Sequence, residues 1–218
     1  MRTLIKFSFV FMLLALVAGC KNDKTKAAKT GDAVDTKATP TATAKTYSNT
    51  RGTINWTGAK LAYDHKGTLN VESGVFSAEG NKIKSGDFII NMASLKNTDL
   101  AGDAEKQGKL EGHLKSADFF DVAQFPKATF SITSVADADT DEANCMITGN
   151  LTMKGVSKSV TFPALVVAKA DGSLTAVSDK FKINRTDWGI KYSSGLAGAV
   201  GDAIISDDIT LQISLEAK

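Results

Sequence analysis

The residues of this chain that could do acid–base or metal chemistry gather in one short stretch. His113 lies there beside three carboxylates, Glu111, Asp118 and Asp121. An imidazole among carboxylates suits proton transfer or a metal ion. The chain has only 2 histidines, however, and this stretch has neither a histidine pair nor a cysteine cluster at metal-ligand spacing. We therefore predict no catalytic residue and no metal site. We expect His113, Asp118 and Asp121 to belong to a lid that a hydrogen bond from His113 ties to the rest of the fold, while an acid–base role for His113 or Asp118 stays open.

Arg185 is the second candidate for chemistry. It has the same parity as Ile183 in an alternating segment, so its guanidinium is expected to point inward. A buried guanidinium must be paired. Two roles are open: a structural ion pair with Asp187, Asp118 or Asp121, or donation to the phosphate or carboxylate of a ligand head group, which suits a planar bidentate cation.

β-Strands must position these residues, because apolar and polar residues alternate through most of the chain. Successive side chains of a strand point to opposite faces, so alternation indicates half-buried strands. The pattern occurs near 52–63, 67–78, 88–93, 129–135, 145–153, 160–166, 181–184 and 205–215. Turn signals such as Glu79-Gly80-Asn81 and Asp171-Gly172 separate the segments. About eight strands joined mostly by short turns predict an antiparallel up-and-down meander.

Such a meander closes into a barrel, which removes unpaired edges. A barrel of about eight strands either fills with side chains or holds one small ligand. We therefore predict an all-β, eight-stranded antiparallel barrel over residues 47–218. For each apolar residue of the inner face, core packing and ligand contact are both open, but as a set these residues line whatever the barrel encloses. They are Phe88, Ile90, Phe130, Ile132, Leu151, Met153, Phe162, Phe181 and Ile183.

Residues 94–124 interrupt the alternation and are too many for a hairpin. Within them, 99–111 reads as a short polar helix, and Phe119 and Phe120 stand between acidic residues. Long insertions in compact domains tend to be functional loops or lids. We predict a short helical lid over one end of the barrel. Phe119 and Phe120 are expected to contact the ligand, with a plug of the barrel end as the alternative.

Residues 1–19 resemble an export signal. The start is basic, and the apolar run from Phe7 to Ala18 is shorter than the ~20 residues of a membrane-spanning helix. Small residues directly before Cys20 resemble a bacterial lipobox, which implies cleavage before Cys20 and lipidation of that residue. The alternative is an ordinary secretory signal followed by a chance cysteine.

Residues 20–46 are predicted to be a lipidated cysteine and a flexible tether. They are mostly Lys, Thr, Ala, Asp and Gly, with Val34 as the one large aliphatic residue. Such a segment buries too little apolar surface to offset its ordering entropy, and it would hold the barrel roughly 25–30 Å from its anchor. The second cysteine, Cys145, lies on an alternating apolar face and is predicted to be a buried structural thiol.

Composition excludes several classes of function. The formal net charge is +2, and no basic patch is interleaved with aromatic residues, so nucleic-acid binding has no support. The chain has no phosphate-cradling glycine loop, dinucleotide fingerprint or Gly-x-Ser-x-Gly nucleophile turn. The glycine-rich stretch Gly195–Gly201 lacks the required strand–helix context and is predicted to be a flexible loop near the mouth of the barrel.

Three ordered motifs identify a family resemblance. They are 113–130, which reads H-L-K-S-A-D-F-F-D-V-x-x-F-P-x-A-x-F; 149–158, G-N-L-T-M-K-G-V-S-K; and 181–190, F-K-I-N-R-T-D-W-G-I. Together they resemble the YceI-like family of lipid- and polyisoprenoid-binding proteins. A looser opening, Trp56-Thr57-Gly58-Ala59-Lys60 followed by His65-Lys66-Gly67, is similar as well. The resemblance implies a lipocalin-like barrel that holds a long apolar chain, and it adds Trp188 of the third motif to the candidate ligand-binding residues.

This resemblance implies a lipid-anchored protein of the bacterial cell envelope. The expected ligand is a polyisoprenoid, such as a quinone, or a fatty acyl compound, which the protein would sequester or transfer without any cofactor. The expected partners are this lipid, the membrane that holds the anchor, and a second copy in a possible homodimer. Lys21 differs from the Asp of inner-membrane retention, which favours the outer membrane. A filled barrel acting as an interaction module in envelope stress, or an enzyme that modifies a lipid, are the alternatives.

Overall fold

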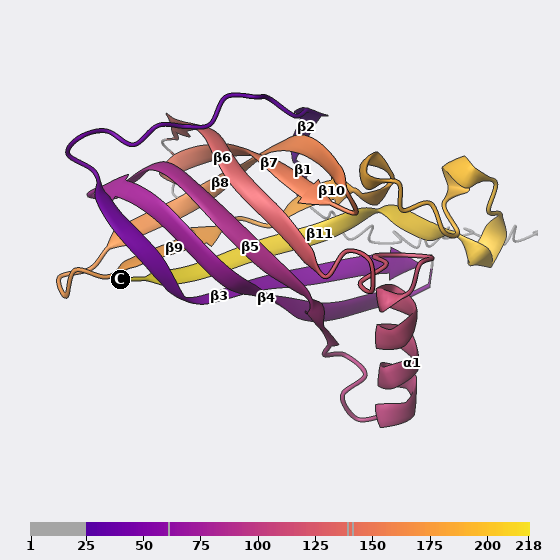
Figure 1. Ribbon diagram of the computed structural model, residues 1–218. Coiled ribbons are helices and arrows are strands. Elements are labelled where there is room, and N and C mark those ends of the chain that lie inside the picture. Colours follow the sequence, from indigo (N-terminus) through magenta and orange to yellow (C-terminus); the bar gives the residue numbers. More distant parts are fainter. Residues whose placement is uncertain (1–24, 61, 139, 141) are drawn as a thin grey trace, which may run out of the picture.

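Strands make up most of the computed structural model, which describes residues 25–60, 62–138, 140 and 142–218 (Figure 1). The predicted signal peptide and Cys20 lie outside the described residues. The strands are β1 (Lys26–Ala27), β2 (Lys29–Asp32), β3 (Lys45–Lys60), β4 (Asp64–Glu79), β5 (Lys82–Asn97), β6 (Lys127–Asp137), β7 (Cys145–Met153), β8 (Val156–Ala168), β9 (Leu174–Ser178), β10 (Phe181–Asn184) and β11 (Ile205–Ala217). The helical elements are α1 (Ala104–Lys115) and the single 3-10 turns η1 (Arg185–Trp188), η2 (Gly195–Ala197) and η3 (Gly201–Ala203).

Eight of these strands close into a barrel, which confirms the predicted fold. Strands β3 to β8 pair antiparallel in chain order, β9 pairs with both β8 and β11, and β11 pairs with β3. The alternating residues fall on matching faces, since Phe88 is the register partner of Phe130 and Phe130 of Leu151. Closure leaves every inward side chain facing one enclosed space.

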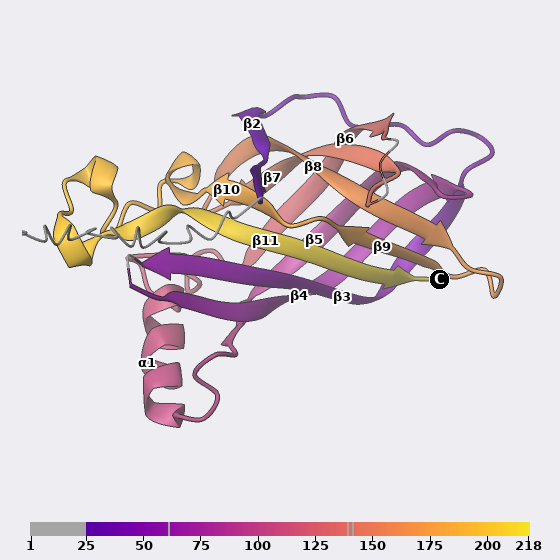
Figure 2. The ribbon, with the colours of Figure 1, turned by 180° about the vertical axis from the view of Figure 1, so that it is seen from behind.

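The two ends of the barrel differ. The β4–β5, β6–β7 and β8–β9 turns meet at one end, where Tyr47 stacks on Phe76 at 5.6 Å and Phe76 on Phe88 at 5.9 Å between ring centroids. We call this the filled end. The β3–β4 and β7–β8 turns lie at the other end, together with α1 and the segment from η1 to η3 (Figures 1 and 2). We call this the mouth.

The barrel wall has a seam toward the mouth, and the N-terminal segment covers it. Among the described strands, β8 and β10 do not pair with one another. Instead β1 pairs parallel with β10, and β2 pairs antiparallel with Lys158–Thr161 of β8. Figure 2 shows β2 running alongside the barrel beside β8. The open edges on both sides of the seam are therefore satisfied by main-chain bonds.

This arrangement differs from the predicted flexible tether over 20–46. In the described part, 25–46, the Ala28 N–H donates to the Lys182 carbonyl at 2.7 Å, and the Ala38 N–H donates to the Ile132 carbonyl at 3.1 Å. The side-chain amide of Asn150 also bonds both the N–H and the carbonyl of Val34. Strand pairing at an open edge uses the main chain, so it needs none of the apolar side chains whose scarcity predicts a coil.

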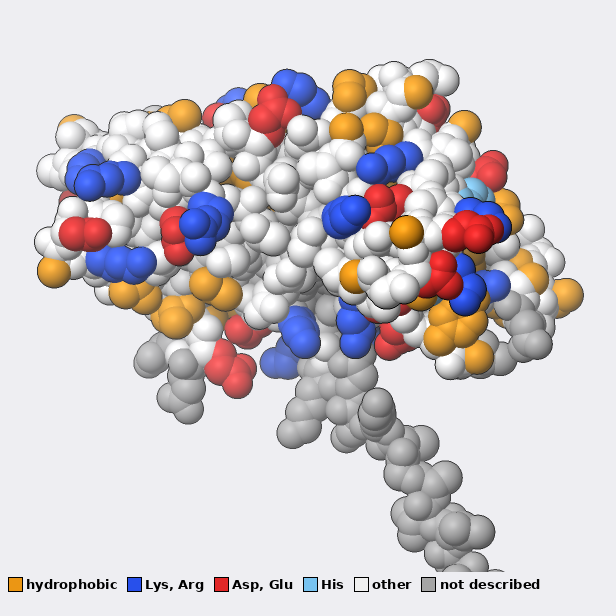
Figure 3. Space-filling model, turned by 90° about the horizontal axis from the view of Figure 1, so that it is seen from below, with side chains coloured by type: hydrophobic (Ala, Val, Ile, Leu, Met, Phe, Trp, Pro, Cys, Tyr) orange, Lys and Arg blue, Asp and Glu red, His pale blue; other side chains and the backbone are white. Residues whose placement is uncertain are grey.

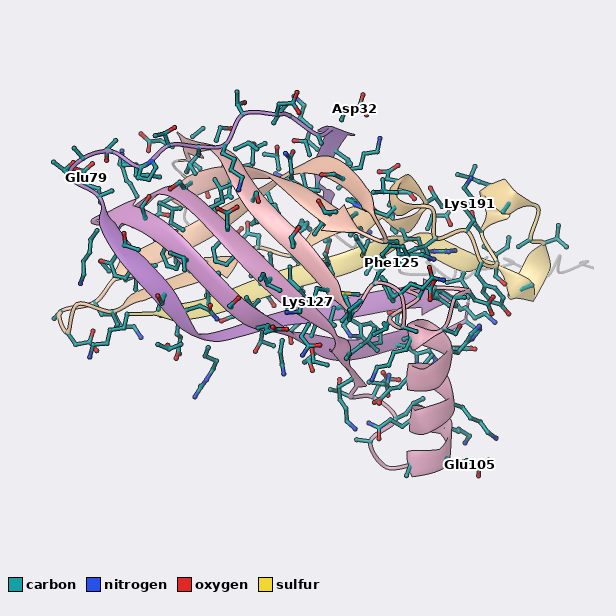
Figure 4. All side chains as sticks on the ribbon, in the orientation of Figure 1. Asp32, Glu79, Glu105, Phe125, Lys127 and Lys191 are labelled. Carbon is teal, nitrogen blue, oxygen red and sulfur yellow. The ribbon has the colours of Figure 1, made fainter. Side chains whose placement is uncertain are left out.

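The predicted helical insertion is present, but helix α1 reaches the mouth only with its last turn. It begins at the N-cap Asp103, whose side chain accepts from the Lys106 N–H at 3.0 Å, and it buries none of its residues. It extends away from the barrel, with Glu105 at its outer tip (Figure 4). Charged side chains of both signs are scattered among apolar ones over the face seen from below (Figure 3). Leu114 of the last turn of α1 packs against the core, and the segment that follows the helix, 116–125, lies over the mouth. We call it the lid segment.

Within the described residues, no helix has both the length and the apolar character that a membrane crossing would require.

Candidate ligand-binding cavity

The barrel is hollow, and its interior forms two cavities. The first, nearer the filled end, has a volume of ≈ 90 Å³. The second, at the mouth, has a volume of ≈ 130 Å³. We call them the inner cavity and the mouth cavity. Either volume is many times the minimum that holds one water molecule, about 10–15 Å³. The space therefore suits several linked carbon atoms rather than one solvent molecule.

The two cavities adjoin at a waist. Four residues line both of them: Ile54 of β3, Ile90 of β5, Leu151 of β7 and Leu211 of β11. These strands stand around the whole circumference of the barrel. The waist is therefore a ring of aliphatic side chains, and a chain-like molecule that fills both cavities must pass through it.

Most residues predicted to bind ligand do lie on these cavities. The inner cavity is lined by Phe88, Ile90, Phe130, Ile132, Leu151, Phe162 and Phe181. The mouth cavity is lined by Ile90, Phe119, Phe120, Leu151, Met153, Ile183 and Arg185. Trp188 lines neither: it is buried beside them and donates its indole N–H to the Leu151 carbonyl at 3.0 Å. Its place is therefore in the wall that supports the waist.

Several lining residues were not among the predicted sites. Examples are Ile54 and Trp56 of β3, and Ile209, Leu211 and Ile213 of β11. Their alternation was visible in the sequence, and it could have placed them on the inner face with the others.

Aromatic rings shape the inner cavity. Phe162 of β8 stacks on Phe181 of β10 with 4.6 Å between centroids and 5° between ring planes. Phe130 packs against Phe162 at 5.6 Å. Phe162 and Phe181 come from the two strands that do not pair across the seam, so their stack closes the wall from inside where β1 and β2 close it from outside. Gly149 is required beneath Phe130, because a Cβ there would overlap that ring.

The lid segment places Phe119 in an aromatic cluster at the mouth. The His113 ring meets Phe119 edge-on at 5.0 Å and Tyr192 edge-on at 4.8 Å, while Phe119 lies 5.2 Å from Tyr192. His113 Nε2 lies 3.2 Å from Asp118 Oδ2, so this contact joins two residues of the insertion, whereas the prediction was a hydrogen bond from His113 to the barrel. Asp121 has a φ of 47° and turns the chain back toward β6. Among the described residues, no three His, Cys, Asp or Glu side chains gather closely enough to hold a metal ion.

Lys154 fastens this lid segment to the β7–β8 turn. Its ammonium donates to the Phe119 carbonyl at 2.6 Å and to the Ala117 carbonyl at 3.3 Å. Replacing Lys154 with Met is expected to speed release of a bound ligand by roughly tenfold, because a charge-assisted hydrogen bond contributes about 1.5–3 kcal/mol. The dissociation rate of a fluorescent fatty acid measures this. Lys127→Met, which removes an exposed lysine paired with Glu72 on the outer wall, is the control. Equal rates in both variants would contradict the fastening role.

Arg185 is held by the protein itself. Its guanidinium donates to three carbonyls, those of Ser206 (3.0 Å), Ile190 (2.8 Å) and Ile205 (3.0 Å). Its Nη2 also lies 3.0 Å from Asp207 Oδ1. That carboxylate oxygen makes no directional hydrogen bond, so the contact is ionic. Burial lowers the pKa of Arg185 from its usual value, and Asp207 opposes this shift.

The ion-pair partner of Arg185 differs from the three predicted aspartates. Asp207 stands 22 positions further along the chain, and only the register of β10 with β11 brings it to Arg185. Asn184 is the register partner of Asp208. Arg185 still lines the mouth cavity, where it is one of few polar groups.

Trp56 supplies another polar group of the mouth cavity. The residue is buried against Gly67 of β4, where a Cβ would overlap the indole ring. Its indole N–H has no hydrogen-bond partner within the described part of the chain. A buried donor without a partner costs about 1–3 kcal/mol, so it is an open position for an acceptor.

Cys145 is buried and free, as the sequence predicts, and its thiol contacts the Ala164 carbonyl at 3.4 Å. Burial, with a smaller contribution from Asp137, raises the pKa of the thiol from 9.0 to about 11. Between these values the unfolded chain loses this proton and the folded chain keeps it. The free energy of unfolding should therefore fall as the pH rises through this window, by about 2–3 kcal/mol at most.

Urea unfolding at pH 8 and at pH 10.5 tests this expectation. Other groups titrate over the same range, so Cys145→Ala is the reference: its loss of stability between the two pH values should be smaller than that of the unsubstituted chain. The same loss in both proteins would mean that the thiol does not contribute.

A closed eight-stranded antiparallel barrel with a hollow apolar interior and a lid at its mouth defines a lipocalin-like protein. A family model of the YceI-like domain matches residues 33–217. The chain therefore belongs to the YceI-like family, as its motifs suggest.

Individual relatives agree with this assignment. The chain is 42% identical over 98 residues to protein YceI of Escherichia coli O157:H7, and 41% identical over 98 residues to protein YceI of Salmonella arizonae. Each match covers 43% of this chain and 50% of the relative, so the chain spans about half the length of the curated relatives it matches.

Two solved structures share the fold. BcnA of Burkholderia cenocepacia has a TM-score of 0.61 at 21% identity, covering 77% of this chain and 96% of that protein. A polyisoprenoid binding domain from Saccharophagus degradans, implicated in plant cell wall breakdown, has a TM-score of 0.55 at 13% identity, covering 79% and 97%.

Proposed function

We propose that this protein binds a long apolar lipid inside its barrel and sequesters or transfers it. The observation that carries the proposal is the pair of adjoining cavities, whose linings are almost wholly aliphatic and aromatic. Apolar surface buried there contributes about 25 cal/mol per Å² to affinity, so a long hydrocarbon gains from every carbon that enters. The description of one solved neighbour as a polyisoprenoid binding domain supports the same class of ligand.

The distribution of polar groups supports one orientation of the ligand. The inner cavity has Ser178 as its polar side chain, and the Ser178 hydroxyl already accepts from the Ile213 N–H at 2.8 Å. The unpartnered indole of Trp56 and the guanidinium of Arg185 both belong to the mouth cavity. The tail therefore lies toward the filled end, and an oxygen-bearing head group, such as a quinone carbonyl or a carboxyl, lies at the mouth.

Trp56→Phe tests this orientation. The substitution keeps an aromatic ring and removes the N–H, so affinity for a ligand with an acceptor oxygen should fall about two- to tenfold. Affinity for a plain alkane of the same length should stay the same. Isothermal titration with a long-chain fatty acid and the matching alkane compares the two. A parallel loss for both ligands would rule out the indole as the head-group donor.

The protein acts by passive carriage in this proposal. The lid segment gates the mouth, and the ligand leaves chemically unchanged. We place the protein in the bacterial cell envelope, attached to the outer membrane through lipidated Cys20, on the strength of the N-terminal sequence. Because β1 begins at Lys26, the linker between Cys20 and the barrel wall would be only a few residues long.

Native mass spectrometry of the full chain isolated from cells, followed by organic extraction, tests the proposal. One long-chain lipid released per protein molecule on denaturation is the expected result, and it would identify the ligand class. A chain without lipid that takes up no quinone, isoprenol or fatty acid would overturn the proposal in favour of an interaction module. A lipid that is chemically altered on incubation, with the change lost in His113→Ala, would favour an enzyme.

A further inference from the structure

The loop between η1 and β11 carries the two most exposed large apolar side chains of the described chain. Leu196 is 82% exposed and Val200 is 79% exposed, whereas the next, Val75, is 53% exposed. Residues 193–204 contain one charged residue, Asp202, among Ser, Gly, Ala, Leu, Val and Ile. We call this segment the mouth loop. Scattered exposed aliphatics are ordinary on a protein surface, but two of them on one nearly uncharged loop form a distinct feature.

Two exposed tyrosines lie next to the mouth loop. Tyr192, 42% exposed, directly precedes it, and Tyr63, 52% exposed, sits in the β3–β4 turn. This turn lies beside the start of β11, because Lys60 is the register partner of Ile205. Tyrosine is enriched where protein meets the membrane–water interface, since its ring is apolar and its hydroxyl is polar.

The mouth loop projects from the opening of the cavity. Both ribbon views show it beyond the end of the barrel, on the same end as α1 (Figures 1 and 2). Ile205 and Ser206, which follow it directly, line the mouth cavity. Arg185 donates to the carbonyls of Ile190 and Ile205, one on each side of the loop, so a single guanidinium fixes both stems. The exposed tip therefore stands at a fixed place beside the route into the barrel.

Two lysines flank the mouth loop. Lys191 precedes it, and Lys60 lies opposite Ile205 across the sheet; neither forms an ion pair with a described carboxylate. An anionic bilayer attracts such lysines, at about 1 kcal/mol each near the surface.

We propose that the mouth loop docks on an anionic lipid bilayer, inserting Leu196 and Val200 and so seating the cavity mouth on the membrane. Tyr63, Tyr192 and the two lysines lie at the level of the head groups. Apolar burial together with attraction to anionic head groups is how peripheral proteins hold to membranes. The proposal rests on the proposed function for its purpose, since a docked mouth lets a lipid pass between bilayer and barrel without crossing water.

Site-specific fluorescence tests the proposal in the full chain. Leu196→Cys is labelled with the environment-sensitive dye NBD, and the protein is mixed with vesicles of phosphatidylethanolamine and phosphatidylglycerol, or reconstituted into them if it is isolated from the membrane. The emission of the dye should shift to the blue, and a lipid with a spin label near its head group should quench it. Val75→Cys is the matched control: it too is an exposed apolar residue, but it lies on β4 toward the filled end.

The buried Cys145 should not react with the dye, and the unsubstituted chain measures any labelling at Cys20. Quenching at position 196 but not at 75 supports docking by the mouth loop. Equal quenching at both positions, or none at 196, overturns it. The assay needs no ligand in the barrel, so its failure leaves lipid binding standing, and a failure of lipid binding in the extraction experiment leaves membrane docking standing.

A second measurement connects docking to transfer. Leu196→Asp combined with Val200→Asp should slow the movement of a fluorescent lipid from protein to vesicles by about tenfold or more, because burial of each aliphatic side chain is lost. The lipid content of the variant as isolated should not change. An unchanged transfer rate would show that the loop does not serve exchange at the membrane.

Discussion

Ile54→Trp is expected to abolish binding of long-chain lipids, lowering affinity by at least about 100-fold, while leaving short-chain ligands bound. Ile54 lines both cavities, and an indole at this position would fill the aliphatic ring of the waist. A molecule that spans both cavities would then lose the inner one. Since each buried CH₂ contributes about 0.8 kcal/mol, losing a handful of carbons from the inner cavity already accounts for two orders of magnitude.

Titration of fatty acids of increasing length measures this effect. For the unsubstituted chain, affinity should rise with length until both cavities are full. For Ile54→Trp it should stop rising at the length that fills the mouth cavity. Overpacking of a tight core costs about 1–3 kcal/mol, so urea unfolding is measured in parallel. Val75→Trp, on the outer wall, controls for the added indole. Full affinity for the longest ligand in Ile54→Trp would mean that the two cavities are not used together.

Alternation along the strands was enough to predict the barrel and most of its lining. Phe130 and Ile132, or Leu151 and Met153, share parity with their neighbours across the sheet, and closure turns each such face inward. The sequence could not show that the interior is hollow. Emptiness depends on how the side-chain volumes compare with the space inside the barrel, and the waist at Leu151 and Leu211 shows that this varies along the axis.

Features that depend on register or on main-chain pairing could not be predicted. Parity placed Arg185 inward, but its partner Asp207 follows from the alignment of β10 with β11. Residues 26–32 have a composition typical of a coil, yet they pair with β10 and β8 because the seam leaves those edges open. The lid segment was predicted as part of a helical lid, whereas most of α1 extends away from the barrel, and only its last turn, with Leu114, and the segment after it reach the mouth.

Arg185→Met is expected to destabilise the protein strongly. It leaves the carbonyls of Ile190, Ile205 and Ser206 without their donor and Asp207 without its counter-charge. Breaking a buried ion pair by removing one partner costs about 3–5 kcal/mol. For a domain of this size, the midpoint of thermal unfolding should fall by about 6–20 °C. Urea and thermal unfolding of the purified chain measure both quantities.

Two comparisons identify the cause of that loss. Arg51→Met removes an exposed arginine of β3 and should change stability by less than about 0.5 kcal/mol. Adding Asp207→Asn to Arg185→Met should recover part of the loss, because the variant then buries no unpaired charge. If the double variant is as unstable as Arg185→Met alone, the three carbonyls account for the effect and the ion pair does not. A stability of Arg185→Met equal to that of Arg51→Met would show that the guanidinium does not hold the stems of the mouth loop.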